Sequence, residues 1–164
     1  MIKKINILIL SMFGLGYSNY APGTVASIVT CLSYIWFYNL QIDLVFLILN
    51  VFLIFIFSAY SIDLFKDSFT QIDAKEIVID EFIGQSIPVL TVYSLIEKNN
   101  LSHFILFTFI SFILFRIFDI LKPFPINIID RKMKNGFGVI LDDIVAGVYS
   151  VLIILTLIFF IDYA

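Results

Sequence analysis

Two pairs of adjacent acids stand beside long apolar stretches of the sequence. Asp142 and Asp143 precede one such stretch, and vicinal aspartates at a helix start supply the hard oxygen ligands that Mg2+ prefers. Asp80 and Glu81 precede another. On a helix their side chains diverge by about 100°, so that one faces a site while the other reaches its edge. For both pairs, the plain alternative is that acids in a first helical turn favour the helix dipole.

A third charged block combines cations with an acid at helical spacing. Arg116 and Asp119 are three residues apart, as are Asp119 and Lys122. A planar guanidinium binds phosphate through paired hydrogen bonds, and Asp119 would orient it. The alternative is a structural ion pair, because an unpaired charge near lipid is costly. Pro123 and Pro125 should end this helix.

The stretch APGTVAS at 21–27 has the pattern of a turn followed by a helix start. Pro22 and Gly23 favour the turn, and Thr24 or Ser27 is expected to cap the helix. The free N–H groups of a helix start can hold a phosphate. Taken alone, the pattern favours an ordinary turn and cap, which is what most Pro-Gly-Thr triplets form.

Composition indicates the kind of element that positions these groups. The chain has 164 residues, of which 61% are hydrophobic and 14% charged, whereas soluble domains have about 45–50% and about 25%. We therefore expect an all-α polytopic membrane protein, forming a single domain over 1–164. The net charge of −3 argues against a nucleic-acid partner. One cysteine, Cys31, excludes an internal disulfide framework.

Five stretches are long and apolar enough to predict membrane-crossing helices. They are residues 24–40, 43–62, 77–96, 101–121 and 138–161. A shorter apolar segment at the N-terminus follows Lys3 and Lys4 and imitates a signal peptide. Because it continues directly into the 14–27 region, we expect it to be retained, as a buried or interfacial helix.

The distribution of cations predicts the orientation in the membrane. With the N-terminus in the cytosol and five crossings, eight of the ten cations fall on the cytosolic side, as positive-inside asymmetry requires. They are Lys3, Lys4, Lys66, Lys75, Lys122, Arg131, Lys132 and Lys134. Lys98 falls outside, and Arg116 lies near the end of the fourth span. The acid pairs, the Arg116 block and residues 21–27 then converge on the cytosolic face.

Other familiar chemistries find no support in the sequence. His103 is the only histidine and falls near the outer end of the fourth span. Cys31 is not followed by the Cys-x5-Arg loop with which cysteine phosphatases bind phosphate. There is no nucleotide-binding glycine motif and no His/Cys metal spacing.

Taken together, the polar blocks resemble the bacterial phosphatidylglycerophosphatase A family. The matching segments are GLGYSNYAPGTVAS (14–27), VIDEFIGQSIPV (78–89), FRIFDILKPFPI (115–126) and GFGVILDDIVAGVYS (136–150). Their order and spacing agree over 14–150, although residues 28–77 match only in character. Ala26 stands where the family usually has glycine.

The resemblance implies a Mg2+-dependent lipid phosphatase that removes the terminal phosphate of phosphatidylglycerophosphate. It implies a multi-pass protein of the bacterial cytoplasmic (inner) membrane, with the lipid substrate and the bilayer as partners and the site facing the cytosol. The implied metal ligands are Asp80, Glu81, Asp142 and Asp143, which with Asp119 are also the implied catalytic acids. The implied phosphate-binding residues are Gly23, Thr24, Arg116 and Lys122. Which acid is ligand, base or nucleophile stays open.

Three other kinds of membrane protein also place charges in a membrane. A transporter would place them near the bilayer midplane, between repeated halves, but no repeat is visible in this sequence. A non-catalytic membrane subunit would use them only to pair helices. A membrane phosphatidyltransferase also clusters aspartates, but its aspartate-rich signature is absent here.

Overall fold

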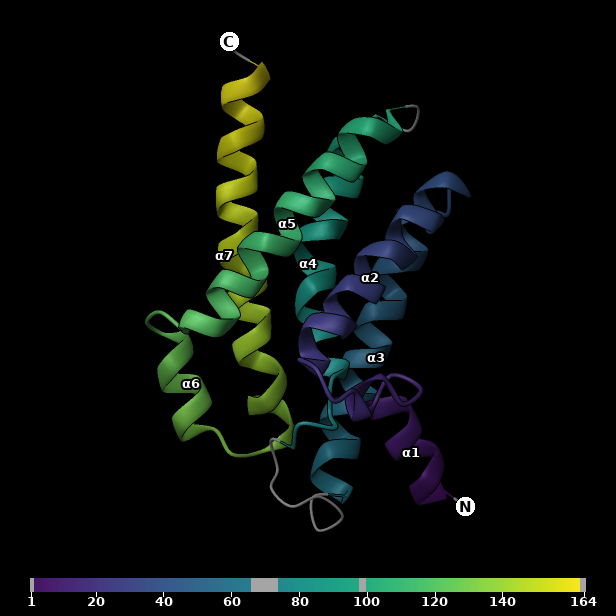
Figure 1. Cartoon of the computed structure of the whole chain (residues 1–164), viewed down its shortest axis with the longest axis vertical. Coiled ribbons are helices and arrows are strands. Elements are labelled where there is room, and N and C mark those ends of the chain that lie inside the picture. Colours follow the sequence, from purple (N-terminus) through teal and green to yellow (C-terminus); the bar gives the residue numbers. More distant parts are fainter. Residues whose placement is uncertain (1, 66–73, 98–99, 163–164) are drawn as a thin grey trace.

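The computed structural model describes residues 2–65, 74–97 and 100–162, and its regular elements within these ranges are all helical (Figure 1). In chain order they are α1 (Ile2–Leu10), a short 3-10 helix η1 (Leu15–Tyr17), α2 (Pro22–Asn39), α3 (Leu44–Phe65), α4 (Ile79–Leu95), α5 (Leu101–Leu121), α6 (Ile126–Lys132) and α7 (Gly136–Asp162). The all-α prediction is confirmed.

Five of these helices run side by side along the length of the molecule, and they correspond to the five predicted spans. The two chain ends lie at opposite ends of the bundle (Figure 1). Within the described residues, α3, α5 and α7 are long and apolar enough to cross a membrane on their own. The chain is therefore a polytopic membrane protein, with α2 and α4 as the more polar members of the bundle.

Helix α4 occupies the centre of the bundle, where it packs against α2, α3, α5 and α7. Its closest neighbour is α7, and glycines make this approach possible. A Cβ atom on Gly147 of α7 would lie only 2.5 Å from the carbonyl oxygen of Gly84 in α4. Small residues of this kind drive helix association in lipid, where apolar burial offers little.

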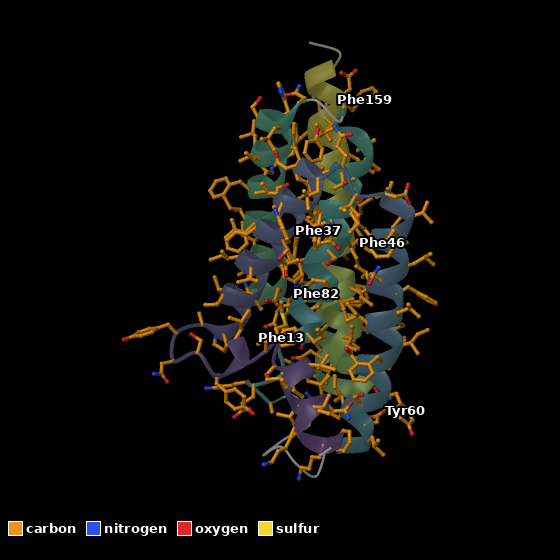
Figure 2. All side chains as sticks on the ribbon, turned by 90° about the vertical axis from the view of Figure 1, so that its right-hand side faces the viewer. Phe13, Phe37, Phe46, Tyr60, Phe82 and Phe159 are labelled. Atoms are coloured by element: carbon orange, nitrogen blue, oxygen red, sulfur yellow. The ribbon has the colours of Figure 1, made fainter. Side chains whose placement is uncertain are left out.

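Apolar side chains cover the outside of the bundle. Phe46 and Tyr60 project outward from α3 (Figure 2), with 59% and 68% of their surface exposed. Inside, Tyr38 of α2 stacks on Phe104 of α5 with ring centroids 4.0 Å apart. Apolar side chains on the outer surface are expected of a protein that is surrounded by lipid instead of water.

The start of α2 differs from the prediction. The helix begins at Pro22, and Ala21 precedes it in a left-handed conformation with φ of 39°, without any side-chain cap. Neither Thr24 nor Ser27 caps the helix, and the Ser27 hydroxyl instead donates to the Gly23 carbonyl at 2.9 Å. Proline explains the difference, because its fixed φ suits the first helical position and it has no N–H group to cap.

The start of α7 also differs. This helix begins at Gly136, whose N–H donates to the Asp63 carboxylate at 2.7 Å. Asp142 and Asp143 therefore lie well over one turn inside the helix rather than in its first turn. The dipole-capping alternative consequently fails for this pair, because the effect fades beyond the first turn.

One short helix was not predicted. The residues between the predicted spans 101–121 and 138–161 contain α6 (Ile126–Lys132). Helix α5 does end before Pro123, as expected, with Lys122 as its C-cap in a left-handed conformation. Helices α1 and α6 both lie at the end of the bundle where α2 and α4 begin (Figure 1).

Candidate active site

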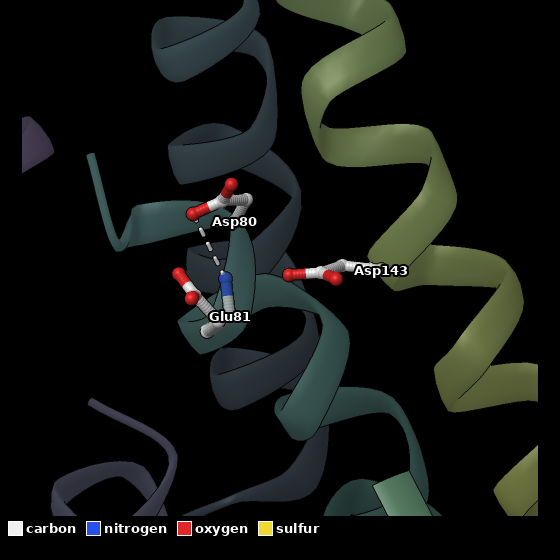
Figure 3. Close-up of side chains that lie close together, drawn as sticks. All are labelled: Asp80, Glu81 and Asp143. Carbon is white, nitrogen blue, oxygen red and sulfur yellow. Dashed lines mark hydrogen bonds between the residues drawn. The ribbon is translucent and has the colours of Figure 1, made fainter. Parts of the chain in front are cut away.

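Three carboxylates from two helices meet at the end of the bundle where α4 begins. Asp80 and Glu81 lie in the first turn of α4, and Asp143 projects toward them from α7 (Figure 3). One oxygen of each lies within 4.8 Å of the others. Asp80 is only 7% exposed and Asp143 only 4%. We call these three residues the acid triad.

The close packing of α4 and α7 brings the triad together. A Cβ atom on Gly84 would lie 2.7 Å from the Asp143 carbonyl oxygen and 2.8 Å from the Phe115 ring. Gly84 follows Asp80 by one helical turn and therefore shares its face of α4. The absence of a side chain at Gly84 thus lets Asp143 come within reach of the two α4 acids.

The beginning of α2 closes the other side of Glu81. A Cβ atom on Gly23 would lie 1.9 Å from Oε1 of Glu81. Gly23, which is predicted to bind substrate phosphate, lies against this carboxylate and also lines the cleft beside it. Glu81 Oε2 is buried and has no hydrogen-bond partner among the described residues.

An open cleft of about 780 Å³ adjoins the triad. Two stretches that are distant in sequence, 16–23 and 74–81, form its walls together with Arg116 of α5. The lining residues are Gly16, Tyr17, Ser18, Asn19, Ala21, Pro22, Gly23, Ala74, Lys75, Glu76, Ile77, Asp80, Glu81 and Arg116. Thr24, a predicted phosphate-binding residue, does not belong to this lining.

Arg116 supplies positive charge beside the acids. Its Nη1 atom lies 2.8 Å from Oδ2 of Asp119, one helical turn away. Its Nε atom is buried and has no hydrogen-bond partner within the described part of the chain. An arginine held by one carboxylate, with a donor still unpaired beside an open cleft, is suited to bind an anion such as phosphate.

Asp119 links Arg116 to the acid triad. Besides its ion pair with Arg116, its carboxyl group lies near enough to those of Asp143 and Glu81 for their charges to interact. Asp119 thus holds the guanidinium and lies near the triad, as an orienting residue would.

Lys122 and Asp142 form a separate pair. Lys122 Nζ lies 2.8 Å from Oδ2 of Asp142 and 3.2 Å from Oδ1 of Asp130 in α6. Burial lowers the pKa of Lys122, but its hydrogen bond to Asp142 and the charges of Asp142 and Asp130 outweigh this and raise it above its ordinary value. The structure places Lys122 outside the cleft lining and Asp142 outside the acid triad.

The donor set of the triad fits a hard divalent cation. Carboxylate oxygens are the ligands of Mg2+, Ca2+ and Mn2+. Buried carboxylates in this proximity repel one another when ionised, and a bound cation reverses that repulsion. The unpaired Glu81 Oε2 is a further ligand position that the protein leaves unused.

Sequence reasoning missed much of the cleft wall. Lys75 and Glu76 directly precede the block that carries Asp80 and Glu81, and residues 16–19 precede α2. The two segments touch, because a Cβ atom on Gly16 would lie 2.0 Å from the Glu76 carbonyl oxygen. The Val78 N–H also donates to the Leu10 carbonyl at 3.0 Å, which ties the 74–78 segment to the end of α1. Residues 16–19 belong to the matching segment 14–27, whereas for Lys75 and Glu76 adjacency to the segment 78–89 was the only signal in the sequence.

Fold and site together define a membrane protein whose polar cleft, bordered by acids and an arginine, lies at the ends of its helices. Comparison with known proteins shows the family to which this chain belongs. A family model described as phosphatidylglycerophosphatase A matches residues 8–158. The chain belongs to the phosphatidylglycerophosphatase A family.

Individual relatives agree with this assignment. The chain is 35% identical over 158 residues to phosphatidylglycerophosphatase A of Haemophilus influenzae, covering 93% of this chain and 91% of the relative. It is also 35% identical over 153 residues, 90% of each chain, to a protein of Bacteroides thetaiotaomicron named putative phosphatidylinositol-3-phosphatase. A phosphatidylglycerophosphatase A of Escherichia coli is 40% identical over 78 residues, 48% of this chain and 41% of the relative. No solved structure matches the chain.

Proposed function

We propose that this protein hydrolyses the terminal phosphate of phosphatidylglycerophosphate, giving phosphatidylglycerol and inorganic phosphate. The observation that carries the proposal is the acid triad, two members of which, Asp80 and Glu81, line one open cleft together with Arg116. Two of the relatives are named phosphatidylglycerophosphatase A. A phosphomonoester carries nearly two negative charges near neutral pH, and this site offers the groups that handle such charge.

Mg2+ is the cofactor we propose, held by Asp80, Glu81 and Asp143. When bound, it would neutralise phosphate charge and make a coordinated water more acidic. Asp142, which was predicted as a fourth ligand, would instead keep Lys122 in place, since the two are already paired at 2.8 Å.

The residues of the chain itself supply the rest of the chemistry. Arg116 binds the non-bridging phosphate oxygens, and Asp119 holds the guanidinium in position. A water oxygen attacks phosphorus while the bond to the glycerol oxygen breaks. The proton of that water passes to a carboxylate of the site and from there to the departing alcohol. Attack by an aspartate, through a phosphorylated carboxylate, is the alternative route to the same products.

The location of the cleft suits a lipid substrate. Lipid head groups lie at the membrane surface, and this cleft lies where α2 and α4 begin and α5 ends. A transporter would instead require its charged site near the middle of the bundle. We therefore favour head-group chemistry over ion passage.

Phosphate release by the purified protein tests the function. Phosphatidylglycerophosphate with Mg2+ should yield phosphate, whereas phosphatidylinositol 3-phosphate should yield much less. The second lipid is included because one relative carries a name of that class. A clear preference for the inositol lipid would reassign the substrate, and no release from either lipid would refute the proposed activity.

Orientation in the membrane can be tested separately. We expect the site to face the cytosol, because Lys75, Lys122 and the basic residues of α6 then lie inside. Two of the ten cations on which the predicted orientation depends, Lys66 and Lys98, lie outside the described residues. In a Cys31→Ser background, a cysteine at the exposed Asn135 should resist an impermeant reagent in intact cells and react after lysis. Labelling in intact cells would reverse the orientation.

Gly23→Ala should weaken the metal site without unfolding the protein. The added Cβ meets the end of the Glu81 side chain, which can move away. Because residues that hold a metal ligand typically affect affinity by about 10–100-fold, half-maximal activity should need at least roughly tenfold more Mg2+. Ser33→Ala, farther along α2, is the control and should keep the wild-type requirement. An unchanged Mg2+ requirement in Gly23→Ala would show that Glu81 does not bind the metal.

A further inference from the structure

An apolar furrow runs along the outside of the bundle between α2 and α5. Its volume is about 290 Å³, and its lining is almost entirely apolar. The lining residues are Ile28, Cys31, Leu32, Ile35, Ile105, Thr108, Phe109 and Phe112. Leu32 and Phe109 are each 59% exposed, so the furrow is open along its side.

Helical geometry joins this furrow to the cleft. On α5, Ile105, Phe109 and Phe112 form a stripe that continues to Arg116 one turn later. Arg116 lines the cleft. On α2, the furrow residues begin at Ile28, five residues after Gly23, which also lines the cleft. The furrow therefore follows the cleft along the same two helices.

The length of the furrow matches a lipid chain. From Arg116 to Ile105 the α5 stripe covers about 16 Å at 1.5 Å per residue. Half of a typical hydrocarbon core is about 15 Å. A lipid whose phosphate lies at Arg116 would thus have its chain beside the furrow over nearly one leaflet.

A larger apolar hollow, of about 630 Å³, does not offer the same connection. Its lining includes Ile79 and Phe82 of α4. These two residues share a face of α4, and at 100° per residue Asp80 and Glu81 lie on the opposite face. A chain in that hollow would be separated from the acids by the helix itself.

We propose that the furrow binds an acyl chain of the lipid substrate and so positions its head group in the cleft. This proposal rests on the proposed function and adds where the apolar part of the substrate binds. The furrow contributes to substrate binding and not to the chemical step. Its loss should therefore raise KM and leave kcat nearly unchanged, and the effect should depend on chain length.

The test compares two substrates that share a head group, dioleoyl and dihexanoyl phosphatidylglycerophosphate, in detergent. Leu32→Trp fills the furrow about 16 Å from Ala21 along α2, beyond the reach of a six-carbon chain. For the dioleoyl lipid we expect KM to rise at least roughly fivefold, as when about one or two methylene groups lose their burial. For the dihexanoyl lipid, KM should stay unchanged. Phe109→Ala, which removes a furrow wall, should act in the same direction.

The matched control is Leu53→Trp on α3. Leu53 is 63% exposed and Leu32 59%, and Leu53 lies outside the furrow lining. If Leu32→Trp and Phe109→Ala both behave like Leu53→Trp while wild type hydrolyses both lipids, the furrow is only surface exposed to bulk lipid and the proposal is wrong. If wild type hydrolyses neither lipid, the proposed function fails, and this inference fails with it.

Discussion

Asp80→Asn and Asp143→Asn are each expected to reduce turnover at least about a hundredfold, which corresponds to about 2.7 kcal/mol of transition-state stabilisation. Asparagine preserves the size of the side chain but removes the charge that holds a cation. Asp80 and Asp143 are 7% and 4% exposed and lie close together where α4 packs against α7 (Figure 3). Removing either should therefore disable the same site.

Non-additivity distinguishes this account from two independent losses. If Asp80 and Asp143 serve one metal, the double variant should be hardly worse than either single variant. Asp43→Asn is the control, because Asp43 caps α3 by accepting a hydrogen bond from the Phe46 N–H at 3.1 Å. Asparagine caps a helix about as well as aspartate, so this variant should keep wild-type turnover. Near-native turnover in Asp80→Asn and Asp143→Asn would reduce those acids to structural roles.

Arg116→Lys is expected to lower activity at least roughly tenfold, or about 1.4 kcal/mol. Lysine keeps the charge but loses the planar pair of donors with which arginine binds phosphate. The buried Nε of Arg116 has no hydrogen-bond partner among the described residues, which leaves a donor for substrate.

A double variant tests the competing role of Arg116. If Arg116 served only to neutralise Asp119, its partner at 2.8 Å, then replacing both residues by leucine should preserve activity. We expect the Arg116→Leu, Asp119→Leu protein to fold and to be inactive. Robust phosphate release from it would exclude phosphate binding by Arg116.

The long helices could be predicted from sequence because lipid imposes a length and an apolar composition on them. The predicted spans 43–62 and 101–121 correspond to α3 (Leu44–Phe65) and α5 (Leu101–Leu121). Helix α6 could not be predicted in this way, because it is only 7 residues long and lies outside the apolar spans. Helix ends also escaped prediction where backbone conformation decides them, as at Ala21 before Pro22.

The site was predictable in kind but not in detail. Convergence of the two acid pairs was expected, and the structure brings Asp80, Glu81 and Asp143 together. Asp142 differs from Asp143 only in helical phase, and that phase directs it toward Lys122. Sequence cannot fix the phase without knowing which face of α7 packs against Gly84.

Metal binding by the purified protein tests the central claim most directly. Mn2+ accepts the same carboxylate ligands as Mg2+ and can be followed by its electron paramagnetic resonance signal. We predict that wild-type protein binds Mn2+ in a manner that Mg2+ displaces, and that Asp80→Asn and Asp143→Asn both lose this binding while remaining folded. Equal, Mg2+-displaceable binding in wild type and both variants, or no binding by an active wild-type protein, would contradict a metal site at the acid triad.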